Sequence, residues 1–389
     1  MRIISATFRL GSAAFLLLLI AYSCQQSARI STVQKVQNFA DSILKTDSLP
    51  GISIVYMFAD LNPVTITSGM ADLEMQIPMD SGMLLLSGSI GKTYVASLVL
   101  RFYELGLIHL NRPVKDYLHD EKWYDSLPNA ALITPLHLLQ HTSGLDRYEF
   151  KKAVWDSIRI RPEKEWTVAE RLALLYQDSP LNDAGKAFAY SDANYILLGA
   201  LLEKVSGMDY YALATDSILL PMKLYMTKPS DRQEIAGLCS AYTAFTEQFQ
   251  LPMKVADNQK LCFNPQMEWT GGGMANTPSD LCRWAQILYS GMYLSDSALN
   301  LMTSPVPFET GISDDASYGM GCIIWKPGTA EVSYGHTGFF PGFRSIVRYY
   351  SQHKLAVAFQ TNTDKLPPAA SLAKYTDQIK QLILDEVPL

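Results

Sequence analysis

The 389-residue chain contains no long basic run, no internal repeat and no low-complexity tract. Its formal net charge is −6, from 32 lysines and arginines against 38 acidic residues, so a nucleic-acid partner has no electrostatic support. Only five cysteines are present, and their spacing matches no metal-binding pattern. The sequence therefore predicts neither a nucleic-acid-binding protein nor a metal site.

Cysteine also gives little sign of a disulfide framework. Cys282 and Cys322 lie in apolar segments, where cysteine behaves as a small hydrophobic residue. Cys239 and Cys262 could pair in an oxidising compartment, but their spacing does not decide between a disulfide and two free thiols.

The N-terminal apolar run is too short to cross a bilayer comfortably. It follows Arg2 and Arg9 and reads "GSAAFLLLLIAYSC" up to Cys24, which is typical of an export signal. Its end resembles a bacterial lipoprotein signal, in which the cysteine is lipidated and becomes the mature N-terminus. An ordinary signal peptide cleaved nearby is the alternative. We expect an exported, periplasmic or cell-envelope protein, anchored in the membrane through a lipid at Cys24.

The rest of the chain has strand-like segments at both ends and a helical middle. Strands are predicted at 51–58, 63–69, 318–325, 343–350 and 354–362, and helices at 32–45, 93–105, 134–140, 167–177, 194–206, 209–219, 278–290 and 368–386. This order predicts an α+β fold whose sheet joins the two chain ends. We expect a signal at 1–24 and one domain at 25–389, with an α/β part at about 30–88 and 300–389 and a helical part at about 89–299.

The stretch "LLLSGSIGKTYVASLVL", residues 84–100, is open to two interpretations. A phosphate-binding loop would need a glycine at position 86, which is Leu86, so that interpretation fails. The other is a serine, Ser89, followed by Lys92 one helical turn later. A lysine whose pKa is lowered by desolvation can act as the base for a serine nucleophile. Alone, the motif is weak, because it occurs often by chance, and a capping serine with a solvated lysine is then the favoured interpretation.

Two distant segments strengthen the serine–lysine interpretation. "FAYSDANY" places Tyr190 just before a predicted helix, and "YGHTGF" places His336 on a strand near the end. With Ser89 and Lys92, these elements resemble the serine β-lactamase and penicillin-binding hydrolase superfamily. The similarity is to the branch that holds class C β-lactamases, DD-peptidases, D-aminopeptidases and related esterases. It implies a β-lactamase/transpeptidase-like fold, an antiparallel sheet with flanking helices and a large helical insertion.

The resemblance implies a role for each matching residue. Ser89 would be the acylated nucleophile, Lys92 its proton partner and Tyr190 a second acid/base group. The backbone N–H groups of Ser89 and Phe339 would form the oxyanion hole. Because these groups suffice for acyl transfer, no cofactor is expected.

Four further residues would contact substrate: Asp192, His336, Thr337 and Gly338. Asp192 departs from the family, which usually has asparagine here; when ionised it cannot donate a hydrogen bond. His336 replaces the lysine common in β-lactamases, which disfavours β-lactamase activity. Gly338 would let substrate approach the strand edge closely.

Other conspicuous residues have structural interpretations. The glycines at 271–273 predict a tight turn before the helix at 278–290. His137 and His141 have the spacing of a zinc-protease motif, but Leu138 occupies the position of its catalytic glutamate. Arg344 is assigned to structure or surface, with a substrate carboxylate as the alternative partner.

The sequence thus predicts an exported serine hydrolase acting through a Ser89 acyl-enzyme. D-amino-acid peptides, including cell-wall peptides, are the expected substrates, followed by small acyl esters and then β-lactams. A non-catalytic penicillin-binding or sensor lipoprotein is the alternative from another class. The oligomeric state stays open.

Overall fold

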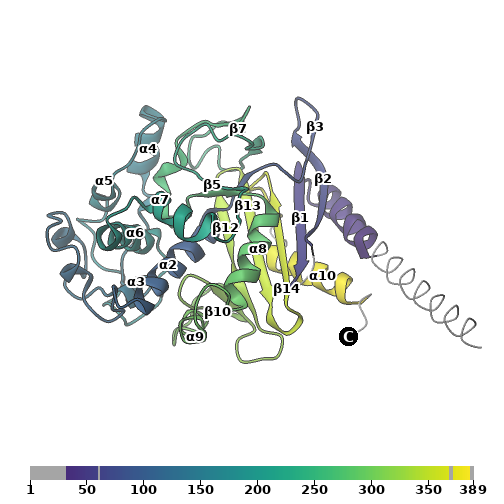
Figure 1. Ribbon diagram of the computed structural model, residues 1–389. Coiled ribbons are helices and arrows are strands. Elements are labelled where there is room, and N and C mark those ends of the chain that lie inside the picture. Colours follow the sequence, from purple (N-terminus) through teal and green to yellow (C-terminus); the bar gives the residue numbers. More distant parts are fainter. Residues whose placement is uncertain (1–31, 60–61, 368–370, 386–389) are drawn as a thin grey trace, which may run out of the picture.

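An eight-stranded sheet joins the two ends of the chain in the computed structural model, which describes residues 32–59, 62–367 and 371–385 (Figure 1). The strand order is β10-β11-β12-β13-β14-β1-β2-β3, and every paired neighbour is antiparallel. The strands are β1 (Gly51–Phe58), β2 (Val64–Asp72), β3 (Ile77–Pro78), β10 (Ala316–Tyr318), β11 (Ile323–Trp325), β12 (Ser333–Phe340), β13 (Phe343–Tyr350) and β14 (Leu355–Thr361). The α+β prediction, with a sheet built from both chain ends, is confirmed.

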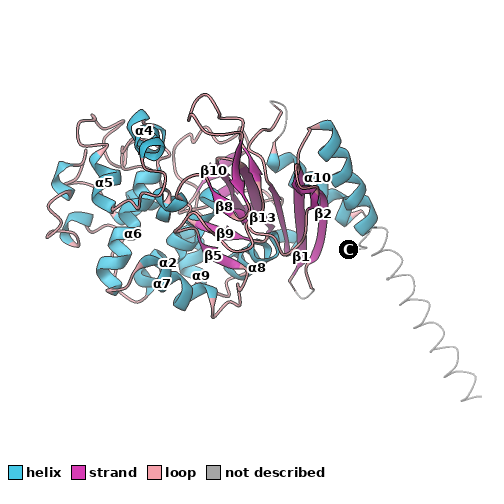
Figure 2. Ribbon diagram, turned by 90° about the horizontal axis from the view of Figure 1, so that it is seen from above, coloured by secondary structure: helices cyan, strands magenta, loops and turns pink. Residues whose placement is uncertain are grey.

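Each face of this sheet is covered by helices, as the alternation of side chains along the strands requires. Ile52 and Ile54 of β1 pack in a core with the helix at 32–46 and α10 (Leu372–Leu384). Val55, which points to the other face, packs in a larger core that includes α8 (Pro278–Tyr289). Figure 2 shows these helices on either side of the central strands.

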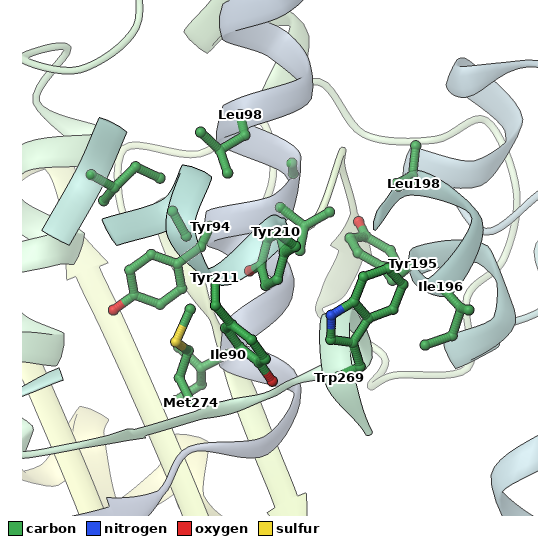
Figure 3. Packing of buried hydrophobic residues seen from close by; sticks show 14 of the residues in the cluster. Ile90, Tyr94, Leu98, Tyr195, Ile196, Leu198, Tyr210, Tyr211, Trp269 and Met274 are labelled. Carbon is green, nitrogen blue, oxygen red and sulfur yellow. The ribbon is translucent and has the colours of Figure 1, made fainter. Parts of the chain in front are cut away.

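The helical part lies beside the sheet and is organised around two long helices. Its helices are α2 (Lys92–Glu104), α3 (Pro135–Leu139), α4 (Lys152–Ile160), α5 (Val168–Ala173), α6 (Asp192–Ser206), α7 (Tyr210–Ala214) and α9 (Asp296–Met302). Figure 3 shows Tyr94 and Leu98 of α2 in the same buried cluster as Tyr195 of α6 and Trp269. Helix α2 also packs against α8, because Tyr94 stacks on Trp284 with ring centroids 4.8 Å apart.

Two small three-stranded sheets complete the fold. One has the order β4-β9-β5 and the other β6-β7-β8. Their strands are β4 (Leu85–Leu86), β5 (Thr227–Pro229), β6 (Ala241–Tyr242), β7 (Lys254–Asp257), β8 (Lys260–Leu261) and β9 (Met274–Asn276). Because β4 pairs with β9, the start of the Ser89 segment is fixed against a segment nearly 200 residues away.

Several predicted boundaries are wrong in detail. The strand predicted at 318–325 is two short strands, β10 and β11, joined by a turn. The helix predicted at 167–177 ends at Ala173, whereas the one predicted at 209–219 is present as α7 followed directly by a π-helix, Thr215–Leu219. Helices α4 and α9 and both small sheets were not predicted.

The described cysteines are free thiols, including Cys239 and Cys262, so the open question of a disulfide is answered in favour of two separate thiols. No helix within the described ranges is long and apolar enough to cross a membrane. The predicted export signal and Cys24 lie outside the described residues.

Candidate active site

Ser89 lies in a tight 3₁₀ turn, Gly88–Gly91, that enters α2 directly at Lys92. Gly88 has a φ of +52°, and a Cβ there would lie 2.6 Å from the backbone nitrogen of Phe339. A Cβ on Gly91 would lie 1.5 Å from the carbonyl oxygen of Gly272. The turn therefore fits between β12 and the 269–273 segment only because both positions lack side chains. Ser89 itself is half-buried.

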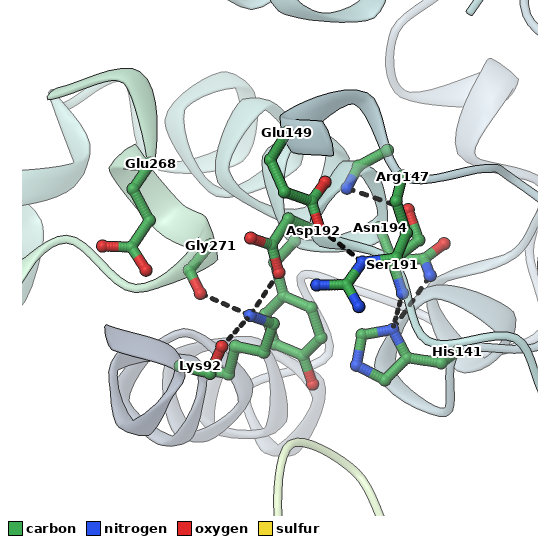
Figure 4. A network of polar contacts seen from close by, with 12 residues as sticks. Lys92, His141, Arg147, Glu149, Ser191, Asp192, Asn194, Glu268 and Gly271 are labelled. Carbon is green, nitrogen blue, oxygen red and sulfur yellow. Dashed lines mark hydrogen bonds and ion pairs between the residues drawn. The ribbon is translucent and has the colours of Figure 1, made fainter. Parts of the chain in front are cut away.

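Lys92 is fully buried and makes three polar contacts (Figure 4). Its Nζ lies 2.9 Å from Ser89 Oγ and 2.6 Å from Asp192 Oδ1. It also donates to the carbonyl oxygen of Gly271 at 2.5 Å. The serine and lysine thus lie in direct contact, as the sequence predicted. The other two partners of Lys92 are Asp192 of α6 and the backbone carbonyl of Gly271.

The charge state of Lys92 differs from the one expected. Burial alone would lower the pKa of Lys92, but the charge of Asp192 and the nearby Tyr190 hydroxyl more than offset this and raise it above its ordinary value. The expectation that desolvation lowers this pKa is therefore wrong, because an anionic partner is buried with the lysine. Lys92 is an ammonium group in the free site.

Tyr190 lies beside this pair, just before α6. Lys92 Nζ lies 5.0 Å from the centroid of the Tyr190 ring. The hydroxyl of Tyr190 is buried beside the side chains of Lys92 and Ser89, although its geometry to neither is that of a full hydrogen bond. Burial raises the pKa of Tyr190, with Lys92 opposing and Asp192 reinforcing the shift. The tyrosine is therefore a neutral phenol whose hydroxyl lies close to both Lys92 and Ser89.

Asp192 is the first residue of α6, where a carboxylate is favoured by the helix dipole. Ser191 caps the helix by accepting from the backbone N–H of Ala193, and its hydroxyl donates to the backbone carbonyl of Asp146 at 2.8 Å. This local capping fixes the direction in which Asp192 faces Lys92.

Three charged residues that the sequence did not single out surround this pair. Arg147 Nε donates to Glu149 Oε1 at 2.6 Å, and the guanidinium carbon of Arg147 lies 5.4 Å from the Tyr190 ring centroid. Glu268 accepts from the backbone N–H of Gly273 at 3.3 Å. Burial, together with the charge of Asp192, raises the pKa of Glu149 to about 7 and that of Glu268 to about 8. The charge of Asp192 raises the pKa of both carboxyl groups, so the three acidic side chains are electrostatically coupled.

His336 lies on β12, but it is buried and both of its ring nitrogens have protein partners. Nδ1 lies 2.5 Å from the carbonyl oxygen of Thr337, which can only accept, so Nδ1 carries the proton. Nε2 is 3.1 Å from the hydroxyl of Tyr318, and that hydroxyl is 3.3 Å from Nε2 of His141. The predicted substrate contact of His336 stays a prediction.

The hydrogen bonds that link His336, Tyr318 and His141 have matching donors and acceptors when both histidines are neutral. The Tyr318 hydroxyl donates to His336 and accepts from Nε2–H of His141. Nδ1 of His141 then accepts from the backbone N–H of Ser191 at 3.2 Å. Burial lowers the pKa of His336 to about 3 and lowers that of His141 well below its ordinary value, with the charge of Lys92 adding to both shifts. This series of hydrogen bonds joins β12 to the start of α6.

The edge of β12 faces the Ser89 turn. β11 pairs only with the Ser333–Gly335 end of β12, and no described strand covers that edge from His336 onward. The backbone nitrogen of Phe339 lies beside Gly88, on the side of the strand where the oxyanion hole is predicted. A Cβ on Gly338 would lie 1.8 Å from the carbonyl oxygen of Ser87, so this glycine permits the close approach of strand and turn.

The structure brings Ser89, Lys92, Tyr190 and Asp192 together where α2 and α6 begin. Gly338 and Phe339 of β12 lie against the Ser87–Gly88 segment, and His336 and Thr337 precede them on the same strand. The tight turn at 271–273 is present, but it also supplies the Gly271 carbonyl to Lys92, which the sequence did not indicate. No group of three or more His, Cys, Asp or Glu side chains among the described residues could hold a metal ion. Such an arrangement is suited to nucleophilic attack by Ser89 on a carbonyl group.

Comparison with known proteins agrees with this chemistry. The family model described as Beta-lactamase matches residues 36–381. Penicillin-binding protein 4* of Bacillus subtilis is 25% identical over 308 residues, which is 76% of this chain and 64% of that protein. The D-alanyl-D-alanine-carboxypeptidase/endopeptidase AmpH of Escherichia coli K12 is 26% identical over 244 residues, 62% of this chain and 57% of that protein. The chain thus spans less than two thirds of the length of each of these two relatives.

Solved structures show the same fold. The D-amino acid amidase from Ochrobactrum anthropi SV3 complexed with D-phenylalanine superposes with a TM-score of 0.77 at 20% identity, covering 92% of this chain and 99% of that one. The D-stereospecific amidohydrolase from Streptomyces sp. gives a TM-score of 0.74 at 24% identity, with 92% and 97% coverage.

Proposed function

Because this chain belongs to the Beta-lactamase family of serine hydrolases, we propose that it hydrolyses amide bonds of D-amino-acid derivatives through an acyl-enzyme on Ser89. The observation that carries this proposal is the contact of Ser89 Oγ with the buried Lys92 ammonium at 2.9 Å, with the Tyr190 hydroxyl close to both groups. A capping serine with a solvated lysine would have neither the burial nor these partners.

The proton chemistry follows from the charge of Lys92. An ammonium cannot accept the Ser89 proton, so the Lys92–Tyr190 pair must first lose one proton. The missing proton can come from either member of the pair. The result is a neutral Lys92 amine beside a Tyr190 phenol, or a Tyr190 phenolate beside a Lys92 ammonium, and the two groups titrate as a coupled pair. Ser89 Oγ then attacks the carbonyl carbon while its proton passes to the pair.

The remaining steps use the same groups. The N–H groups of Ser89 and Phe339 hold the oxyanion of the tetrahedral intermediate. The pair returns its proton to the leaving nitrogen as the C–N bond breaks, leaving an ester on Ser89. A water molecule, deprotonated by the same pair, attacks this ester and restores the serine.

D-amino-acid substrates are proposed from two observations. The open edge of β12 offers backbone groups to an extended, peptide-like substrate, which a simple ester would not need. Similar proteins carry the names D-alanyl-D-alanine-carboxypeptidase/endopeptidase and D-amino acid amidase. Thr337 and Gly338, on this edge, would contact the substrate.

The experiment is a substrate panel with purified protein and its Ser89→Ala variant. D-amino-acid p-nitroanilides, the L-enantiomers, a D-Ala-D-Ala peptide, p-nitrophenyl acetate and a chromogenic cephalosporin are compared. Turnover of a D-amide or D-peptide that requires Ser89 supports the proposal. Turnover of the ester or the cephalosporin alone would replace it with esterase or β-lactamase activity.

Export and lipidation at Cys24 are proposed from the sequence alone. In a bacterial host, the full chain should partition with membranes and incorporate radiolabelled palmitate, and Cys24→Ala should abolish the label. Cytosolic, unlabelled wild-type protein would refute this part of the proposal without touching the catalytic part.

A further inference from the structure

We infer that Asp192 makes the site selective for substrates with a free ammonium group on the carbon next to the scissile carbonyl, so that N-terminal amino-acid amides and peptides are favoured over N-acylated ones. This rests on the proposed function and narrows it to amidase or aminopeptidase-type cleavage. Asp192 is thereby a specificity residue as well as a partner of Lys92.

The carboxylate of Asp192 has one oxygen to spare. Oδ1 is occupied by Lys92 at 2.6 Å, whereas Oδ2 accepts no hydrogen bond from any residue in the described ranges. The side chain retains 10% exposure, so the site is not sealed. The Lys92 ammonium group contacts both Asp192 Oδ1 and Ser89 Oγ, so only this group separates the aspartate from the reacting serine oxygen. A substituent next to the scissile carbonyl is therefore within its reach.

The carboxyl groups of the cluster can adjust their protonation to a bound cation. Three carboxyl groups, those of Asp192, Glu149 and Glu268, surround two cations, Lys92 and Arg147 (Figure 4). The second oxygen of Glu149, Oε2, is buried and accepts no hydrogen bond from described residues. Without a ligand, the raised pKa values of Glu149, about 7, and Glu268, about 8, mean that the cluster retains protons near neutrality. A substrate ammonium would favour the ionised forms of these carboxyl groups, so its binding would release part of those protons.

An acylated nitrogen would meet the opposite situation. Its acyl carbonyl oxygen is an acceptor, and an ionised carboxylate has no proton to give. The two acceptors would repel each other in a site with little water. An asparagine at this position could donate through its amide, so an isosteric change should reverse the preference.

The first test compares D-alanine p-nitroanilide with N-acetyl-D-alanine p-nitroanilide, which share a leaving group. We expect wild-type kcat/KM to be at least about tenfold higher for the free amine, the size of one charge-assisted hydrogen bond. Asp192→Asn should bring the ratio near one or below, whatever its absolute activity. Asp146→Asn, a matched loss of a neighbouring carboxylate, should keep the wild-type ratio. A wild-type preference for the acetylated substrate, or an unchanged ratio in Asp192→Asn, overturns the inference.

The second test does not depend on turnover. In the Ser89→Ala background, D-alaninamide should bind at least about tenfold more tightly than N-acetyl-D-alaninamide by calorimetry, and added Asp192→Asn should remove the difference. Equal affinities would overturn the inference even if Ser89-dependent hydrolysis is found. If hydrolysis is absent but the preference holds, the proposed enzymatic function fails and the inferred recognition stands.

Discussion

Lys92 Nζ and Asp192 Oδ1 lie 2.6 Å apart in a pair that is shielded from solvent, with the lysine fully buried. Because the aspartate holds the lysine as an ammonium, the proton that limits catalysis is one that the pair must lose before Ser89 can react. This relationship distinguishes the site from one with a neutral asparagine, and it leads to a pH prediction.

Asp192→Asn should shift the acidic limb of the kcat/KM profile to lower pH by about one unit. In the wild type, the negative charge of Asp192 raises the pKa values of Lys92 and Tyr190, so removing it lowers both. The direction is the same whether the base is the amine or the phenolate. Stopped assays on one substrate from neutral pH to above pH 11 measure it, because the raised pKa values of both groups place this limb on the alkaline side. A limb that stays in place or moves to higher pH contradicts the mechanism.

Tyr318→Phe should disrupt the link between β12 and α6. Nε2–H of His141 would lose its acceptor and Nε2 of His336 its donor, which costs about 1–3 kcal/mol of unfolding free energy. We expect kcat to fall by about tenfold with KM little changed, because alignment and not affinity is lost. Chemical denaturation and steady-state kinetics measure both effects.

Tyr289→Phe is the control for this change, because the Tyr289 hydroxyl is buried and has no hydrogen-bond partner among the described residues. It should leave the stability and kcat near wild type. If Tyr318→Phe behaves like Tyr289→Phe, the hydrogen-bonded chain has no positioning role.

Gly91→Ala should lower kcat/KM strongly while the protein stays folded. The new Cβ would meet the Gly272 carbonyl oxygen at 1.5 Å, so the Ser89 turn must move away from the segment that holds Lys92. A displacement of this kind can lower kcat/KM by about a hundredfold. Gly82→Ala, whose Cβ meets only Asp80 Oδ1 at 3.2 Å, should be active. Full activity of Gly91→Ala would show that the packing of this turn is not required.

The buried histidines predict a loss of stability in mild acid. Burial lowers the pKa of His336 from 6.5 to about 3, so the unfolded chain takes up more protons than the folded one between those values. The contribution of His336 is complete above pH 6.5 and is lost progressively below it, by on the order of 3 kcal/mol at pH 4. In His336→Gln the decline in unfolding free energy from pH 7 to 4 should be shallower, while exposed His109→Gln should follow the wild type. Parallel wild-type and His336→Gln curves would contradict the neutral histidine.

The sequence predicted the parts of this fold that depend on local pattern. The long strands β1, β13 and β14 alternate or run apolar over seven or eight residues, and α6 and α8 begin with the capping side chains of Ser191 and Thr277. The strand-like segments at both ends of the chain, with helices between them, predicted that one sheet joins the two ends. β4 and β9, at two and three residues, are too short to show any pattern, although they position the Ser89 segment.

The electrostatics of the site could not be predicted in the same way. Glu149, Glu268 and Tyr318 come from three separate segments, and only folding brings them near Lys92 and the histidines. Asp192 was noticed as a departure from asparagine, which was the one available signal of an acidic site. Its effect, raising the pKa of Lys92 against the pull of burial, depends on a contact distance that no sequence spacing gives.

The most direct measurement of the central claim is the intact mass of the purified protein after treatment with a fluorophosphonate, in wild type and Ser89→Ala. The account predicts a single adduct on the wild type, mapped to Ser89 by peptide sequencing, and none on Ser89→Ala. Equal labelling of both proteins, or no adduct on a folded wild type with this or any other acylating probe, would contradict a Ser89 nucleophile.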